Sequence, residues 1–334
     1  MFRHSALLTI SLLLALSAGC GPRPLYDFDL TPHHGMPGPE DLVLDGPDRL
    51  LVSSQDRRTE PPPPGAVYAL DMPSGEVTEL PRMGEPEGLS FHPHGMDLMR
   101  GDDGILRLYV INHRLDGQDP PHAIVVYRVL ADRLEFLELL EDPLLASPND
   151  LAALPDGQLY VGNDRSAGGG LTEMVLGLKK STVVHYDGQG AWKVVAEGLA
   201  YTNGIAVLGH RVIVAATREN AIYSFARLGD GSLTLETRVA RVPGPDNFFV
   251  AGDDLFVAGH PRPLAFVAHA RNPAKPSPSH VYRMDLATYE MELLFADDGR
   301  GISASSTGIW VDQTLWIGQV FDPFVVRARI RGEE

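Results

Sequence analysis

The 334-residue chain is poor in cysteine and in positive charge. Its one cysteine, Cys20, excludes a disulfide bond within the chain. Its 28 Lys and Arg residues face 44 Asp and Glu residues, which gives a formal net charge of −16. Such an excess of negative charge argues against nucleic acid or an anionic membrane surface as the partner. Long helical patterns are absent too, so the many short apolar runs point to strands.

The N-terminus has the features of an export signal. Residues 6–16 form an apolar run that is shorter than the ~20 residues a membrane span needs. The sequence Leu-Ser-Ala-Gly-Cys at 16–20 resembles a bacterial lipobox, in which the cysteine becomes the lipidated first residue of the mature protein. We therefore expect residues 1–19 to be a signal peptide, Cys20 to carry lipid, and residues 20–38 to form a Pro- and Gly-rich tether.

This interpretation makes the protein an exported bacterial lipoprotein. Gly21 rather than Asp follows the cysteine, which favours the outer membrane, with the protein facing the periplasm or the cell surface. The alternative is an ordinary secretory cleavage near Ala18. That cleavage would leave Cys20 unmodified and the protein periplasmic or secreted.

A recurring hairpin predicts the fold. Residues 147–164 form two short apolar runs around a Pro-Asp-Gly turn, with Asn and Asp at both outer ends. Similar units recur 43 to 61 residues apart, and a third strand often follows. An all-strand repeat of this kind is typical of propeller blades. The sequence therefore predicts an all-β, six-bladed β-propeller over residues 39–334, with residues near 25–30 adding an outer strand to the last blade. The six markers are Glu40, His94, Asn149, Asn203, Asp246 and Thr307.

These markers also predict a site. The innermost strand of each propeller blade lines the central channel, so the first residues of the six inner strands meet at one mouth. Here those residues and their neighbours are nearly all oxygen-bearing, which is the ligand set of a hard cation and best of calcium. A single Asn-Asp pair more often caps a strand end or a turn. Five such groups at one mouth favour a metal site.

At these positions the sequence resembles the paraoxonase/arylesterase family, six-bladed calcium-dependent lactonases. The resemblance runs from about residue 40 to residue 326, and each short motif is weak by itself. Their joint order and spacing make the resemblance specific. The motifs are Glu-Asp at 40–41, Phe-His-Pro-His-Gly at 91–95, Val-Ile-Asn-His at 110–113, Pro-Asn-Asp at 148–150, Gly-Asn-Asp at 162–164, Asp-Asn at 246–247 and Gly-His-Pro at 259–261.

The resemblance implies two calcium ions. A catalytic ion would be held by five side chains: Glu40, Asn149, Asn203, Asp246 and Asn247. A second, structural ion would be held by Asp41, the backbone carbonyl of Met96 and Asp150.

The implied reaction is hydrolysis of lactones or aryl esters. The sequence does not decide whether phosphotriesters are cleaved as a side activity. The metal would polarise the carbonyl while a side chain activates water. His94 and His113 match the family's proposed histidine pair, and Asp164 matches a competing candidate for the base. His260 is expected at the site wall in a structural role.

Because the sequence departs from the family pattern in the pocket wall, the family's substrate preference cannot be transferred to it. Arg58 stands in place of an aromatic wall residue, and Asp322 replaces a histidine, while Tyr201 keeps an aromatic ring beside the metal. Two other functions stay in view: a sugar lactonase of the gluconolactonase type, and a non-catalytic, calcium-stabilised binding propeller. The histidine pair and the doubled calcium residues speak against the first. Retention of the ligand set, with His94 and Asp164, speaks against the second.

Overall fold

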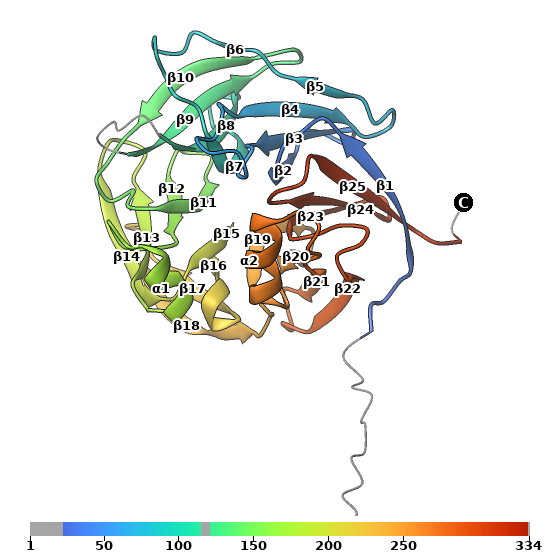
Figure 1. The fold of residues 1–334 in the computed structure, drawn as a ribbon. Coiled ribbons are helices and arrows are strands. Elements are labelled where there is room, and N and C mark those ends of the chain that lie inside the picture. The colour runs from blue at the N-terminus through green and yellow to red at the C-terminus, as the bar shows by residue number, and fades with distance from the viewer. Residues whose placement is uncertain (1–22, 115–120, 333–334) are drawn as a thin grey trace, which may run out of the picture.

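Six β-sheets surround a central channel in the computed structural model, which describes residues 23–114 and 121–332 (Figure 1). This architecture confirms the predicted six-bladed β-propeller. The expected signal peptide and the lipidation site Cys20 lie outside the described residues. Within those residues, no helix has the length and apolar character needed to cross a membrane.

Each blade runs from an inner strand at the channel to an outer strand at the rim. The first blade contains β2 (Pro39–Leu44), β3 (Arg49–Ser54), β4 (Ala66–Asp71) and β5 (Val77–Glu79), and the second contains β7 (Pro93–Arg100), β8 (Leu106–His113), β9 (His122–Val129), β10 (Leu134–Leu140) and β6 (Arg82–Met83). The third contains β11 (Pro148–Ala153), β12 (Leu159–Asn163), β13 (Ser181–Tyr186) and β14 (Trp192–Leu199), and the fourth contains β15 (Thr202–Leu208), β16 (Arg211–Ala216), β17 (Ala221–Arg227) and β18 (Leu233–Ala240). The fifth contains β19 (Pro245–Ala251), β20 (Asp254–Gly259), β21 (Ser279–Asp285) and β22 (Met291–Asp297), and the sixth contains β23 (Ser305–Val311), β24 (Thr314–Gln319), β25 (Phe324–Ile330) and β1 (Phe28–His34).

Strand pairing closes the ring. The N-terminal strand β1 lies antiparallel to β25 as the outer strand of the sixth blade, in register from Phe28 opposite Ile330 to His34 opposite Phe324. The expected outer strand is therefore present, and it begins three residues later and ends four residues later than the expected range 25–30. The two ends of the described chain are held together by backbone hydrogen bonds, by the packing of Phe28 with Val326 and by the Arg331–Asp29 ion pair.

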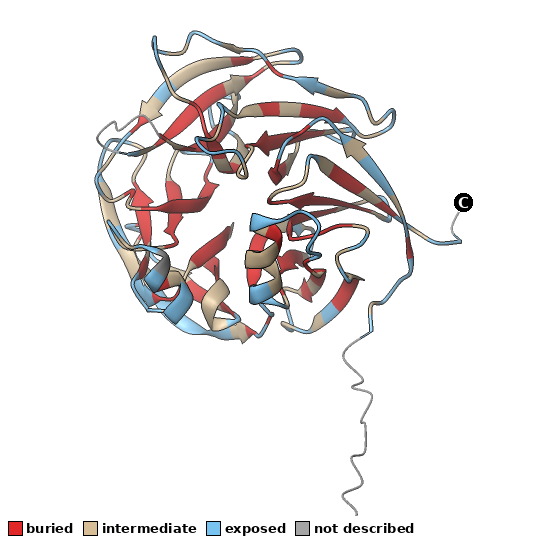
Figure 2. Cartoon of the chain, in the orientation of Figure 1, coloured by how far each residue is buried: buried red, intermediate tan, exposed pale blue. Residues whose placement is uncertain are grey.

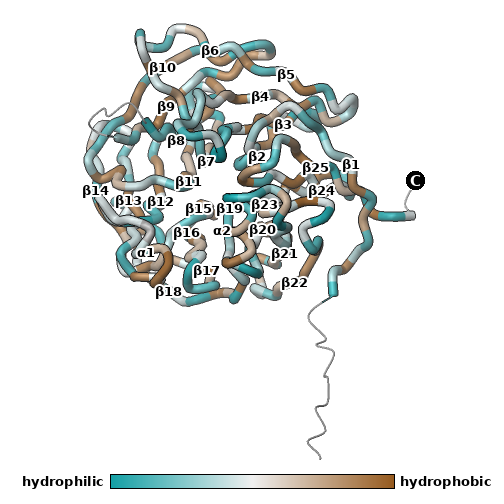
Figure 3. Tube along the Cα trace, in the orientation of Figure 1, coloured by the Kyte–Doolittle hydropathy of each residue, from teal (hydrophilic) through white to brown (hydrophobic). Residues whose placement is uncertain are grey.

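The core lies between neighbouring blades and fixes the inner strands in place. Burial is greatest in the inner and middle strands, such as β11 and β16, whereas outer strands such as β14 and β18 carry many exposed residues (Figure 2). Apolar residues are spread through every blade rather than collected in one region (Figure 3). Between the first two blades, for example, Leu51 packs in one cluster with Phe91 and Tyr127. Removing a buried aromatic such as Tyr127 costs about 3–5 kcal/mol.

Two short helices lie in loops at one end of the channel (Figure 1). Helix α1 (Leu171–Leu176) ends at Gly177, which adopts a left-handed conformation with φ 61°. Helix α2 (Pro263–Arg271) begins with a proline, a residue whose fixed φ suits a first helical turn. Each helix is too short to leave a periodic pattern in the sequence. Both contribute to the walls of the pocket described below.

Candidate metal centre

A backbone irregularity opens each inner strand. In all six inner hairpins the pairing register shifts at the start of the strand, as in a β-bulge. A bulge releases residues from regular pairing and re-aims their side chains. The residues skipped by the pairing are Glu40, His94 and Gly95, Asn149, Asn203 and Gly204, Asp246 and Asn247, and Ser306 and Thr307. The bulges thus free all five predicted ligands of the catalytic ion, and His94, from regular strand pairing.

Glycine lets these bulges pack closely against one another. A Cβ atom on Gly95 would lie 2.3 Å from the carbonyl oxygen of Asn149 in the next blade. A Cβ atom on Gly204 would lie 2.4 Å from the carbonyl oxygen of Asp246. Both approaches are too close for a side chain, so glycine is required beside the ligand positions.

Four oxygen atoms at this mouth are buried without a hydrogen-bond partner. They are Glu40 Oε2, Asn149 Oδ1, Asn203 Oδ1 and Asn247 Oδ1. Their four side chains are at most 5% exposed. Leaving one buried acceptor unsatisfied costs about 1–3 kcal/mol. Four such acceptors together indicate a space prepared for a cation.

Neighbouring acceptors hold the amide groups in the orientation that a cation needs. The amide nitrogen of Asn247 donates to Glu40 Oε1 at 3.1 Å and to Thr307 Oγ1 at 3.2 Å. The amide nitrogen of Asn149 donates to Asp164 Oδ2 at 3.5 Å. With their nitrogens engaged in this way, both amides leave their oxygens unpartnered.

Asp246, the fifth predicted ligand, is paired with His260. His260 Nε2 donates to Asp246 Oδ2 at 2.6 Å, and both side chains are buried. The contact follows from the hairpin, because Gly259 at the end of β20 pairs with Pro245 at the start of β19. Burial raises the pKa of Asp246, and the His260 hydrogen bond opposes that rise. His260 therefore orients the carboxylate of Asp246, a more specific role than the wall position expected from the sequence.

The composition of this set is distinctive. Among the described residues, no group of three or more His, Cys, Asp and Glu side chains is placed to hold a metal ion. Three of the five predicted ligands here are asparagines, and amide oxygens suit calcium rather than zinc or iron.

The predicted histidine pair is close together but does not share a hydrogen bond that orients His94. The rings of His94 and His113 lie 5.0 Å apart, edge to face. His94 Nε2 is 3.9 Å from Glu40 Oε1, while its Nδ1 lies 3.1 Å from Arg57 Nη2. His113 Nδ1 instead contacts Nδ1 of His122 at 3.0 Å. Burial, with the Arg57 charge second, lowers the pKa of His94 to about 3.

Asp164 contacts the predicted ligand set through the amide nitrogen of Asn149. Its Oδ1 accepts hydrogen bonds from Ser147 Oγ at 2.5 Å and from Arg165 Nε at 3.0 Å. Burial, with the Asp164 charge second, raises the pKa of Tyr201 well above its usual range. Tyr201 has φ 63°, which is uncommon for a non-glycine residue and marks a constrained site.

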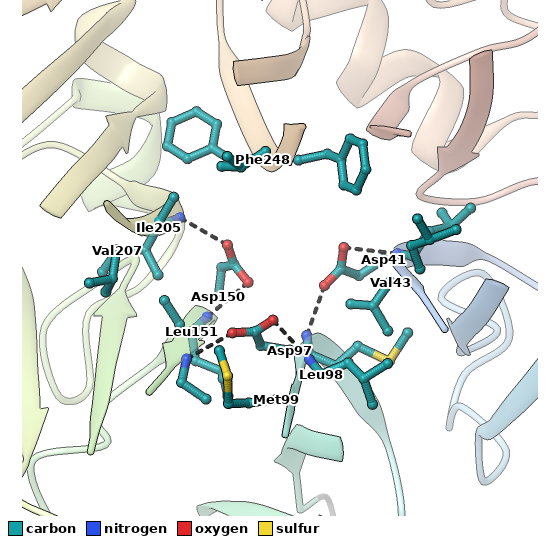
Figure 4. Close-up of a pocket in the computed structure, with 18 of the residues that line it drawn as sticks. Asp41, Val43, Asp97, Leu98, Met99, Asp150, Leu151, Ile205, Val207 and Phe248 are labelled. Carbon is teal, nitrogen blue, oxygen red and sulfur yellow. Dashed lines mark hydrogen bonds between the residues drawn. The ribbon is translucent and has the colours of Figure 1, made fainter. Parts of the chain in front are cut away.

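The residues predicted for a second ion lie deeper in the channel. Asp41, Met96 and Asp150 line one cavity of about 300 Å³, and Asp97 lines it with them (Figure 4). Asp41 Oδ2 accepts from Met96 N at 2.8 Å, and Asp150 Oδ2 accepts from Ile205 N at 2.9 Å. These carboxylates are already hydrogen-bonded, in contrast to the oxygens at the mouth. Burial raises the pKa of Asp41 and of Asp150 well above the usual range.

A second cavity of about 240 Å³ opens above the predicted catalytic ligands. Its inner surface includes Glu40, Asn149 and Asn203. Its outer walls are largely apolar and come from both helices, and their residues are Met174, Val175, Pro263, Leu264, Phe266 and Val267.

The two polar replacements noted in the sequence pair with each other. Arg58 Nη1 donates to Asp322 Oδ1 at 2.6 Å, and Arg58 Nη2 lies 2.9 Å from Nε2 of His269 in α2. The pair therefore joins the loop after β3, the loop after β24 and helix α2 instead of presenting free charges to the cavity.

The structure thus defines a six-bladed propeller with buried, unpartnered side-chain oxygens at one channel mouth, beneath an apolar pocket. A family model described as arylesterase matches residues 35–325. The chain belongs to the arylesterase (paraoxonase) family.

Individual relatives are more distant. Human serum paraoxonase/lactonase 3 is 27% identical over 280 residues, covering 78% of this chain and 76% of the human protein. A solved gluconolactonase from Xanthomonas campestris has a TM-score of 0.56 at 18% identity and covers 91% of this chain and 90% of that one. Regucalcin from Agrobacterium tumefaciens, described as a calcium-binding protein, has a TM-score of 0.56 at 13% identity, covering 90% and 91%. The two structures share the fold.

Proposed function

We propose that the protein is a calcium-dependent carboxylic ester hydrolase that acts on lactones, aryl esters or both. The observation that carries the proposal is the set of four unpartnered, buried oxygens at the channel mouth, three of which belong to residues that line the floor of an apolar pocket. Membership of the arylesterase family and the relative named paraoxonase/lactonase support a lactonase-type hydrolase.

The proposed calcium ligands fit the ion in charge and in donor type. Glu40 and Asp246 supply two carboxylates, and three asparagines supply neutral oxygens. Calcium takes 6–8 oxygen ligands, so five side chains leave room for water or substrate. A calcium ion bound there would polarise the ester carbonyl as a Lewis acid. The neighbour described as calcium-binding regucalcin supports this metal.

Charge in the channel supports a second ion. Five carboxylates lie along it, with Arg57 as a cation close to Glu40 and Asp246. We propose that Asp41, Asp150 and the carbonyl of Met96 hold this ion. Its charge would offset the burial, and the carboxylate repulsion second to it, that raise the pKa of both aspartates. The five carboxylates are Glu40, Asp41, Asp97, Asp150 and Asp246.

The residues around the pocket have two further roles, binding the substrate and activating water. Apolar side chains of α1 and α2 hold the organic part of the substrate and exclude water from the reacting group. His94 faces the pocket floor, and Asp164 lies behind Asn149. These two groups are the candidates for activating water.

A sugar lactonase is the second candidate, because a solved gluconolactonase shares the fold. The apolar walls of the pocket favour an organic ester over a polyhydroxylated aldonolactone. A calcium-stabilised binding propeller without activity is the third. Phosphotriester cleavage would be a side activity of the first.

We also propose that the mature protein is exported and anchored in the bacterial outer membrane through lipid on Cys20. Metabolic labelling with a radioactive fatty acid should mark the wild-type protein and not the Cys20→Ser variant. Label in both proteins, or in neither, would contradict the anchor.

A substrate panel tests the catalytic proposal. The domain without its anchor is given an aliphatic lactone, an acyl-homoserine lactone, phenyl acetate, an aldonolactone and a phosphotriester. Each is measured as purified, after a calcium chelator and after calcium is restored. Chelator-sensitive, calcium-restored hydrolysis of a lactone or of phenyl acetate is expected. Turnover of the aldonolactone alone would favour the sugar lactonase, and no turnover with calcium bound would favour the binding propeller.

A further inference from the structure

The guanidinium of Arg57 is fixed beside the pocket by carbonyl groups from three blades. Its Nη1 donates to Gly38 O at 3.0 Å, Gln55 O at 3.2 Å and Val320 O at 3.4 Å. Its Nη2 lies 3.1 Å from His94 Nδ1 and 3.5 Å from Pro93 O. The sixth, first and second blades therefore hold this cation in one place, with one nitrogen aimed at the imidazole.

This contact determines which nitrogen of His94 carries the proton. An arginine side chain stays protonated and has donors but no acceptor. The His94 Nδ1 that receives its hydrogen bond must therefore carry a lone pair. In a neutral imidazole the proton then resides on Nε2. Nε2 is the nitrogen on the side of the ligand cluster, 3.9 Å from Glu40 Oε1.

We propose that Arg57 is a positioning residue that holds His94 as an Nε2–H donor toward the reacting carbonyl oxygen, and that His94 is not the general base. This inference rests on the proposed ester hydrolysis. A protonated Nε2 cannot accept a proton from water, but it can stabilise the oxygen that becomes negative as the carbonyl is attacked.

The proton then follows another route. Water oxygen bonds to the carbonyl carbon, and the water proton passes to the carboxylate of Asp164. As the tetrahedral intermediate collapses, the carbon–oxygen bond to the leaving group breaks. The alkoxide recovers that proton, which returns Asp164 to its ionised form and yields the acid and the alcohol.

Nitrogen NMR tests the tautomer directly and does not depend on activity. The calcium-loaded protein is prepared with ¹⁵N-labelled histidine, and the His94 ring signals are assigned by their loss in His94→Gln. We expect a protonated Nε2 and an unprotonated Nδ1 in the wild type and in Arg57→Lys, which keeps a cationic donor. Arg57→Leu should lose this preference. A protonated Nδ1 in the wild type, or an unchanged tautomer in Arg57→Leu, would overturn the proposal.

Kinetics separate a donor from a base. Glutamine keeps an N–H donor but is no base, whereas phenylalanine is neither. We expect His94→Phe to lower kcat about 10²–10³-fold, the usual effect of losing one oxyanion donor, and His94→Gln to retain at least about ten times more activity than His94→Phe. Equal loss in both variants, with calcium still bound in each, would identify a base and refute the donor role.

The controls keep this inference separate from the proposed function. His34→Gln and Arg107→Lys change exposed or half-exposed residues outside the site and should leave the kinetics and the His94 signals unchanged. A protein with no turnover of any ester would refute the proposed hydrolase. The NMR result would still decide whether Arg57 sets the His94 tautomer.

Discussion

The two levels of the central channel use the same kind of side chain in opposite ways. At the mouth, Glu40 and the asparagines keep buried oxygens without partners. Deeper in the channel, each of Asp41, Asp97 and Asp150 accepts one backbone N–H from its own strand and one from the next blade (Figure 4). The oxygens at the mouth have no hydrogen-bond partner, whereas the carboxylates deeper in the channel link successive blades.

This difference has an energetic meaning. An unpartnered buried acceptor destabilises the fold until a ligand binds it. The residues at the mouth therefore lower the stability of the free protein and keep a binding site preorganised. A carboxylate that bridges two backbone N–H groups stabilises the fold through charge-assisted hydrogen bonds. Substitutions at the two levels should therefore have opposite effects on binding and on stability.

The largest effect is expected from breaking the mouth. Asn203→Ala and Asp246→Ala each remove a proposed calcium ligand, so ester hydrolysis should be abolished and calcium affinity should fall at least about 100-fold. Calcium-free Asn203→Ala should be as stable as the wild type or more so, because it loses an unpartnered oxygen. Titration calorimetry and thermal unfolding in chelator measure both. Asn272→Ala, at the exposed C-terminus of α2, is the matched control. Wild-type calcium affinity in Asn203→Ala would remove it from the site.

The next largest effect is expected from removing a carboxylate of the set deeper in the channel. Asp97→Ala leaves the N–H groups of Leu98 and Ala153 without their acceptor, each of which it binds at 2.8 Å. The free energy of unfolding in chelator should fall by about 2–4 kcal/mol. Denaturant titration measures this loss, with Asp103→Ala at an exposed ion pair as the control. An unchanged unfolding midpoint would show that the bridge contributes no stability.

The mouth was more predictable from the sequence than the lower set. Propeller geometry brings the first residues of the inner strands to one place, so the repeat alone located Asn149, Asn203 and Asp246. Asp97 was missed because its contact with Ala153 of the next blade depends on the packing of two inner strands. No repeat spacing carries that information.

Other partners of the site were hidden for related reasons. Arg57 reaches His94 from a loop 37 residues away, and only the closed ring brings them together. The role of His260 could have been found from the hairpin rule, because the end of a second strand returns to the start of the first. The same rule placed Asp164 beside Asn149.

A smaller effect should appear in the pH dependence of stability. Burial raises the pKa of Asp97 to about 6 from 3.8. The folded, calcium-free protein therefore binds this proton more tightly than the unfolded chain does. The Asp97 contribution to stability is greatest below about pH 4 and is lost as the pH rises to about 6. Thermal unfolding in chelator should show this slope in the wild type and a shallower one in Asp97→Asn. Equal slopes would contradict the raised pKa.

The smallest effect is expected from the ion pair between Arg58 and Asp322. Arg58 and Asp322 are partnered, as the lower carboxylates are, but each side chain is 20% exposed. Solvent screening limits such a pair, so a double-mutant cycle of Arg58→Leu and Asp322→Leu should give a coupling energy of at most about 1 kcal/mol. Because Arg58 also contacts His269 in α2, loosening the pair should change KM for bulky esters more than kcat. If kcat fell while KM stayed constant, Arg58 would act on the chemistry instead of on the pocket wall.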